Sequence, residues 1–199
     1  MHRCVADADR LALTDHPATR ERYVDYLVRL YGFQAPLESA FSLVSGLPPD
    51  VAVREREWTR TLVSDLQALG YSLERVLYTP LHKRRPFRSA AEALGWLYVA
   101  EVTRNGHQLL RHFLARKVPD VLLGASPEIG RVSHDQWQAL SSALDDVASS
   151  DEAQGELHDA ALDAYDAQHR WFRPDAPSGS AIKSGLEGAR LAIGRSGAG

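Results

Sequence analysis

Residues 89–117 read SAAEALGWLYVAEVTRNGHQLLRHFLARK, and this stretch decides the fold. Ser89 and Glu92 form a capping box, in which two side chains satisfy the first free N–H groups of a helix. No proline follows within the stretch, and its apolar side chains recur at helical spacing. The stretch therefore predicts one long helix that ends near Lys117.

The chain before this helix shows the same spacing in two further segments. Thr19 is the expected N-cap of the first, and Pro36 is expected to kink or break it. Gly70 is expected to end the second segment as its C′ residue. Between Gly70 and the long helix, residues 78–87 predict an irregular loop with two prolines and a basic run.

Two more helices are predicted after the long one. A capping box of Ser133 and Gln136 begins the first, and the second runs from about Asp151 to Phe172. Because no strand-like alternation or repeat appears, the sequence predicts an all-α, single-domain helical bundle of five to seven helices. We expect its core to include the large apolar residues of the inner helix faces: Tyr23, Leu27, Trp58, Leu62, Leu94, Leu97, Trp137 and Tyr165.

The domain is expected to span residues 1–177. Residues 178–199 are rich in Gly, Ser and Ala and lack aromatic side chains, which predicts a flexible tail. The four tryptophans, at positions 58, 96, 137 and 171, are interpreted as core residues rather than as groups that stack on a cofactor.

Composition narrows the class of protein. A net charge of −3 with 25% charged residues favours neither a nucleic-acid partner nor an anionic membrane surface. Cys4 is the only cysteine, which excludes an internal disulfide. No apolar run approaches the roughly 20 residues of a membrane span, and the N-terminal residues lack the apolar core of a signal peptide. We therefore expect a cytoplasmic protein with no membrane partner and leave the oligomeric state open.

No common catalytic motif is present. The sequence has no Walker loop, no dinucleotide-binding glycine pattern, no H-E-x-x-H and no C-x-x-C. His107 and His112 are five residues apart, which does not suit a pair of metal ligands on one helix.

Two segments instead resemble a known family. YVDYLVRLYGFQAPLE, residues 23–38, resembles the second helix of bacterial haem oxygenases, including those encoded beside bacteriophytochromes. ALGWLYVAEVTRNGHQLLRH, residues 93–112, resembles their distal helix, usually written LG-x-LYV-x-EG-x-T-x-GG. With the later helices, the resemblance covers about residues 2–174.

The resemblance implies a haem held between a proximal helix, which carries a histidine ligand, and a distal helix rich in glycine. Haem is then both cofactor and substrate, and it is cleaved to biliverdin with release of CO and iron. The resemblance also implies a partner that supplies electrons, a ferredoxin or a flavin reductase.

His2 is the residue that the resemblance makes the proximal iron ligand, because it lies 21 positions before Tyr23. A neutral imidazole there would leave one axial position of the iron for O₂. The alternative is an N-terminal histidine without a ligand role.

The distal motif departs from the family pattern at two of its glycine positions. Val102 and His107 stand where the family has glycines, and only Gly106 is retained. Val102, Gly106 and His107 are thus the distal residues expected to contact haem, and a Cβ there would hold the backbone away from the porphyrin.

His107 has four open alternatives. It could be a sixth iron ligand that blocks O₂, donate a hydrogen bond to O₂, close the pocket, or lie in solvent or in the core. Thr103 and Asn105 are candidate catalytic residues together with His107, since they could hold a distal water network; ordinary polar positions on a half-exposed helix are the alternative.

The basic loop has two interpretations. Arg84, Arg85 and Arg88 could meet haem propionates or an acidic ferredoxin, or form a solvated surface. The sequence thus favours a haem-cleaving enzyme, with a non-catalytic tetrapyrrole-binding or regulatory protein on the same scaffold as the alternative. An unrelated small-molecule enzyme on this scaffold is a weaker third hypothesis.

Overall fold

The computed structural model describes residues 18–47, 49–125, 134–147 and 149–173. These residues form α2 (Arg20–Phe41), α3 (Pro49–Ala68), α4 (Leu73–Leu77), α5 (Ala90–Lys117), the 3-10 helix η1 (Pro119–Leu122), α6 (His134–Val147) and α7 (Asp151–Trp171). The described ranges contain no strand, which confirms the predicted all-α bundle. His2, Ser133 and the tail predicted at 178–199 lie outside the described residues. No helix in these ranges has the length and apolar character that crossing a membrane requires.

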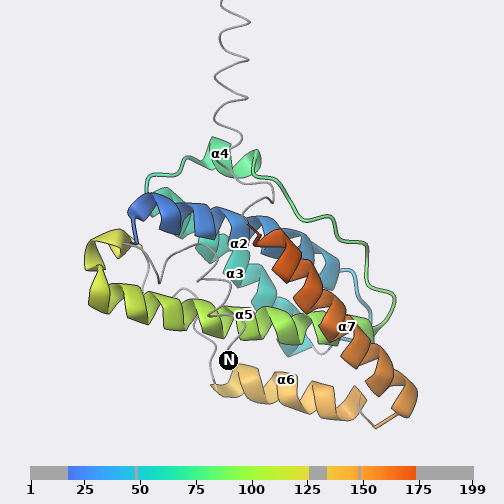
Figure 1. The fold of residues 1–199 in the computed structure, drawn as a ribbon. Helices are drawn as coiled ribbons and strands as arrows, with labels where there is room; N and C mark the ends of the chain where they lie inside the picture. Colours follow the sequence, from blue (N-terminus) through green and yellow to red (C-terminus); the bar gives the residue numbers. More distant parts are fainter. Residues whose placement is uncertain (1–17, 48, 126–133, 148, 174–199) are drawn as a thin grey trace, which may run out of the picture.

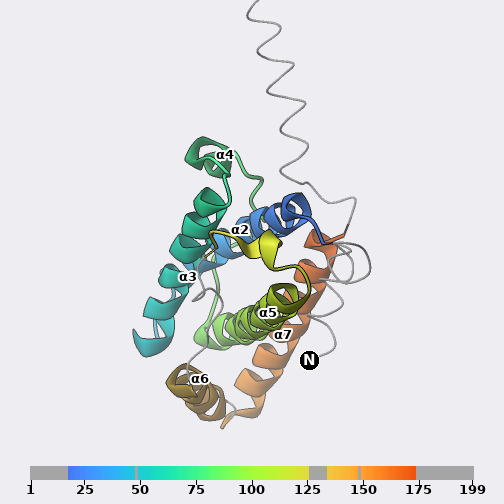
Figure 2. The same cartoon turned by 90° about the vertical axis from the view of Figure 1, so that its left-hand side faces the viewer.

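The long helix α5 lies at the centre of the bundle (Figure 1). Figure 2, a view nearly along α5, shows α3 on one side of it and α7 on the other, with α2 above and α6 below. The helix predicted from residues 89–117 is therefore the element that the other helices surround.

Local signals place the helix ends as the sequence predicts. The N–H of Arg22 donates to the Thr19 hydroxyl at 3.3 Å, and the N–H of Glu92 donates to the Ser89 hydroxyl at 3.0 Å. Gly70 adopts φ +87° after α3. The N–H of Tyr71 then reaches the Leu66 carbonyl at 2.8 Å, as in a Schellman turn.

The predicted core is mostly confirmed. Six of its eight residues are at most 3% exposed: Tyr23, Leu27, Trp58, Leu62, Leu94 and Leu97. Tyr165 is partly buried against the core, but Trp137 is 39% exposed, so its assignment to the core is wrong. The helix α6 lies at the periphery and buries only Leu140 and Ala143 among its described residues. The ring of Trp137, one turn earlier, lies 6.3 Å from the ring of Tyr98 between centroids.

The predicted break at Pro36 is also wrong, because α2 continues to Phe41. Proline has no N–H for the carbonyl four residues earlier, which is that of Gly32. That carbonyl accepts instead from the N–H of His82 at 2.8 Å. A Cβ on Gly32 would overlap the carbonyl oxygen of Pro80, so glycine lets the loop pass against α2 and satisfy the helix from outside.

A second glycine sets the closest helix pair. A Cβ on Gly95 of α5 would overlap the carbonyl oxygen of Leu157 and lie 2.9 Å from the Cβ of Ala160, both on α7. The absence of a side chain at Gly95 therefore allows α7 to cross α5 in direct backbone contact.

Candidate functional site

One face of α5 stays accessible beside the surrounding helices. Val102, Asn105, Gly106, Leu109 and Phe113 share this face, because they follow one another at spacings of three or four residues. The first three are half-buried, while Leu109 is 45% and Phe113 is 38% exposed. We call these five residues the open face of α5. Its mainly apolar character suits contact with a flat apolar ligand.

Thr103 lies on another side of α5, in the contact with α7. Its hydroxyl donates to the Val99 carbonyl at 2.8 Å and accepts from the Gln168 side-chain amide at 2.7 Å. Both hydrogen-bonding directions of the hydroxyl are thus used within the bundle.

His107 points into the core towards α2. It is 1% exposed, and its ring lies nearly parallel to Tyr26, at 5.5 Å between centroids, and to Tyr23, at 6.3 Å. Neither ring nitrogen has a hydrogen-bond partner among the described residues. Burial, with a smaller contribution from the charge of Arg111, lowers the pKa of His107 to about 3, so the ring is neutral at pH 7.

A buried ion pair lies one turn beyond His107. Nη1 of Arg111 donates to Asp65 of α3 at 3.0 Å and to the Tyr23 hydroxyl of α2 at 3.1 Å. Burial raises the pKa of Tyr23, so its hydroxyl stays protonated. Through this group α5 is joined to α2 and α3 directly beside the His107 ring.

A second buried pair lies on the inward side of α5, away from the open face. Arg104 donates to Glu101 at 3.1 Å, and its guanidinium lies 4.7 Å from the centroid of the Trp58 ring. Arg104 occupies the position of the threonine in the family pattern, and its charge is compensated within one turn of the same helix.

The sequence analysis missed both buried pairs, although a signal for them exists. Arg104 and Arg111 share the inward face of α5 with His107, at spacings of three and four residues. Asp65 likewise lies between Leu62 and Leu66 on the buried stripe of α3. A charge inside an apolar stripe indicates a buried partner, because an unpaired buried charge is costly.

The basic loop is partly structural. The guanidinium of Arg84 pairs with Glu92 at 2.9 Å and lies over the rings of Phe87 and Trp96, at 4.2 and 4.4 Å. Arg88 pairs with the same carboxylate at 3.3 Å but is largely exposed, and Arg85 is exposed. Glu92, which accepts these charges and the N–H of Arg88, has a lowered pKa: burial raises it, but these hydrogen bonds and the Arg84 charge outweigh that effect.

The described residues can supply one wall of a haem site. The open face of α5 offers an apolar surface with Gly106 at its centre, where the backbone lacks a Cβ. No group of three or more His, Cys, Asp or Glu in these ranges could hold a metal ion. The iron ligand predicted at His2 lies outside them, so its role stays a prediction, as do the catalytic roles of Thr103, Asn105 and His107.

Comparison with known proteins gives one informative similarity. No family model matches the chain, and no solved structure matches it. Over 154 residues, 74% of each chain, it is 29% identical to the heme oxygenase PigA of Pseudomonas aeruginosa. Together with the all-helical bundle, this similarity points to a haem oxygenase-like family.

Proposed function

We propose that this protein binds haem against the open face of α5 and cleaves it oxidatively to biliverdin, with release of CO and iron. The observation that carries the proposal is the partly exposed, mainly apolar open face of α5, four of whose five residues lie within residues 93–112, the segment that resembles the distal helix. The similarity to a heme oxygenase supports the same chemistry. The bacteriophytochrome-associated subtype is part of the proposal and rests on the sequence resemblance alone.

In this proposal the residues of the open face have different tasks. Leu109 and Phe113 exclude water from the porphyrin face, and Gly106 lets the backbone approach it. The side-chain amide of Asn105 can hold a water molecule at the same face or donate a hydrogen bond there from its NH₂ group. Bound haem supplies the redox-active iron and is itself the molecule that is cleaved.

The residues outside the open face support the site. His2 would hold the haem iron through its imidazole, and a ferredoxin or a flavin reductase would supply the electrons. Thr103 and His107 act as positioning residues, because their contacts with α7 and α2 fix the rotation of α5 about its axis.

A non-catalytic haem-binding role is the second candidate, and Val102 favours it. Its isopropyl group lies on the open face where the family pattern has glycine, so it holds the porphyrin farther from the helix backbone. Greater separation would weaken the contacts that orient the ring for cleavage while leaving apolar binding possible.

A haem titration followed by turnover separates the two functions. A one-to-one complex with a Soret band is expected, and addition of a reductant under air is expected to convert this band into the absorption of biliverdin. Binding without conversion, with conversion appearing in Val102→Gly, would establish the binding protein instead. No saturable haem binding by either protein would overturn both proposals.

A further inference from the structure

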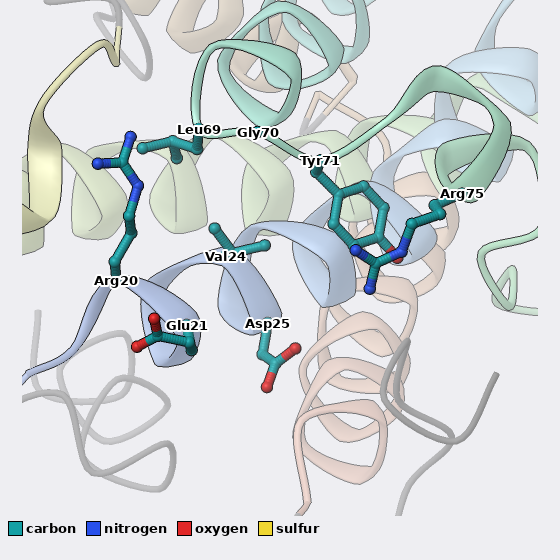
Figure 3. Close-up of a pocket in the computed structure, with 8 residues that line it drawn as sticks. All are labelled: Arg20, Glu21, Val24, Asp25, Leu69, Gly70, Tyr71 and Arg75. Atoms are coloured by element: carbon teal, nitrogen blue, oxygen red, sulfur yellow. The ribbon is translucent and has the colours of Figure 1, made fainter. Parts of the chain in front are cut away.

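A cleft of about 260 Å³ lies away from the open face of α5, between the first turns of α2 and the turn that joins α3 to α4 (Figure 3). Its apolar part consists of Val24, Leu69 and Tyr71, of which the last two are 7% and 4% exposed. The Schellman turn at Gly70 fixes this wall. Its N–H groups are used within the turn, since Gly70 donates to Gln67 at 2.9 Å and Tyr71 to Leu66 at 2.8 Å.

Two arginines flank this apolar wall from different elements. Arg20 of α2 donates from Nη2 to the carbonyl of Leu123 at 2.7 Å, which anchors its guanidinium while other N–H groups stay available. Arg75 of α4 lies over the Tyr71 ring, 4.2 Å from its centroid. Neither makes an ion pair with another described residue.

The two carboxylates that border the cleft, those of Glu21 and Asp25, point in another direction than the two guanidinium groups. Figure 3 shows the side chains of Glu21 and Asp25 pointing away from the wall formed by Leu69 and Tyr71. The charged groups nearest to that wall are therefore guanidinium groups, which favour a negatively charged ligand.

We propose that this cleft binds a small monocarboxylate with an apolar body, its carboxylate on the guanidinium of Arg75 and its body on Val24 and Leu69. A planar guanidinium matches the two oxygens of a carboxylate. The volume is below the roughly 300–1,000 Å³ of common ligand pockets, which limits the body to about one aromatic ring. Inorganic phosphate fits less well, because the apolar wall would remove its hydration without replacing it.

Binding in the cleft would also stabilise the bundle. The opposite side of the same α2 turns carries Tyr23 and Tyr26, which contact Arg111 and His107 of α5. A ligand that binds only the folded chain raises the free energy of unfolding by mass action. Binding at this site requires no haem, so the proposal can be tested independently of the proposed function.

The test is a titration of the full-length, haem-free protein with phenylacetate, followed by ¹H–¹⁵N NMR. Saturable shifts are expected for the amides of Val24, Leu69, Gly70 and Tyr71. Arg75→Gln is expected to weaken binding about tenfold, since it removes one charged hydrogen-bond donor group. The matched control, Arg60→Gln, makes the same change at an exposed position of α3 outside the cleft and should leave the affinity unchanged.

Three further ligands test the assigned chemistry. Phenylacetamide and inorganic phosphate should each bind at least about tenfold more weakly than phenylacetate, because each lacks one of the two features. Phenylalanine binding more tightly than phenylacetate would overturn the assignment to a simple anion. Shifts that map elsewhere, or equal loss of binding in Arg75→Gln and Arg60→Gln, would overturn the site.

Discussion

His107 combines complete burial with two ring nitrogens that find no partner among the described residues. Its parallel contacts with Tyr23 and Tyr26 are those of an aromatic core residue. The helix places His107 on a different side from Val102 and Gly106. On the open face, the residue that departs from the glycines of the family pattern is therefore Val102. These positions explain how a histidine can replace a glycine of the pattern without covering the face that contains Gly106.

Replacing His107 with Phe should therefore stabilise the protein. The phenyl ring keeps the contacts with both tyrosines and removes two unsatisfied buried nitrogens, for an expected gain of about 1 kcal/mol in the free energy of unfolding. His107→Ala should instead cost about 3 kcal/mol through the cavity that it leaves. Urea denaturation at pH 7 measures both; a phenylalanine variant less stable than the alanine variant would contradict this packing.

The stability difference between wild type and His107→Phe should depend on pH. The folded pKa of about 3 lies below the ordinary value, so between about pH 6.5 and 3 only the unfolded chain holds a proton on this ring. Stability contributed by the neutral ring is present above this window and falls as the pH falls. The advantage of His107→Phe should grow by about 2 kcal/mol from pH 7 to pH 5. A constant difference across these two pH values would show that the histidine is solvated.

The Arg111–Asp65 pair should behave as a unit. Asp65→Asn leaves a buried guanidinium without its counter-charge and should cost about 3–5 kcal/mol, whereas replacing both residues with Leu should cost less than the sum of the single changes. A double-mutant cycle in urea supplies the coupling energy. Additive single effects would mean that the two charges do not interact.

At the scale of elements, the crossing of α5 and α7 depends on Gly95. Gly95→Ala should cost about 1–3 kcal/mol, because its Cβ meets the backbone of α7 and the helices must separate. Gly155→Ala is the matched control: it lies in α7 with nothing within 4 Å of the added Cβ, and should stabilise by about 0.5–1 kcal/mol. Equal effects of the two changes in chemical denaturation would contradict the close crossing.

The helices could be predicted from the sequence where their determinants are local. Thr19, Ser89 and Gly70 act through neighbouring backbone groups, and the sequence predicts each correctly. The continuation of the helix through Pro36 could not be predicted from local sequence. The Gly32 carbonyl that Pro36 leaves without a donor accepts from the N–H of His82, which is far from it along the chain. The assignment of Trp137 to the core was wrong for a similar reason. Periodicity gives the inward face of a helix, but it does not give how much of that face the neighbouring helices cover.

The candidate site could be predicted in part. The segment 93–112 locates it, and its helical periodicity separates Val102 and Gly106 from His107. The direction in which His107 points depends on where α2 lies. Asp65 and Arg111 come from different helices, so a local pattern can mark each charge as buried but cannot pair the two. The family resemblance therefore grouped Val102 and Gly106 with His107 as one set of haem contacts, although these residues lie on different faces of α5.

At the scale of the whole molecule, the described helices surround α5 (Figure 2), and the residues of its open face are half-buried or exposed. That arrangement makes a single helix responsible for both the core and the proposed haem contact. Substitutions on its inward side should alter stability, and substitutions on the open face should alter haem binding. Val102→Gly should thus raise the rate of biliverdin formation at a cost of about 1 kcal/mol in stability, measured by absorbance and by urea denaturation.

The central claim is that haem binds against the open face of α5, and paramagnetic NMR tests it most directly. Ferric haem should broaden the amide signals of Val102, Asn105, Gly106 and Leu109, while those of α3 residues such as Arg60 stay sharp. The diamagnetic zinc porphyrin, as control, should shift the same signals without broadening them. Broadening centred on α3 or α4, or no saturable effect of ferric haem on α5, would contradict the account.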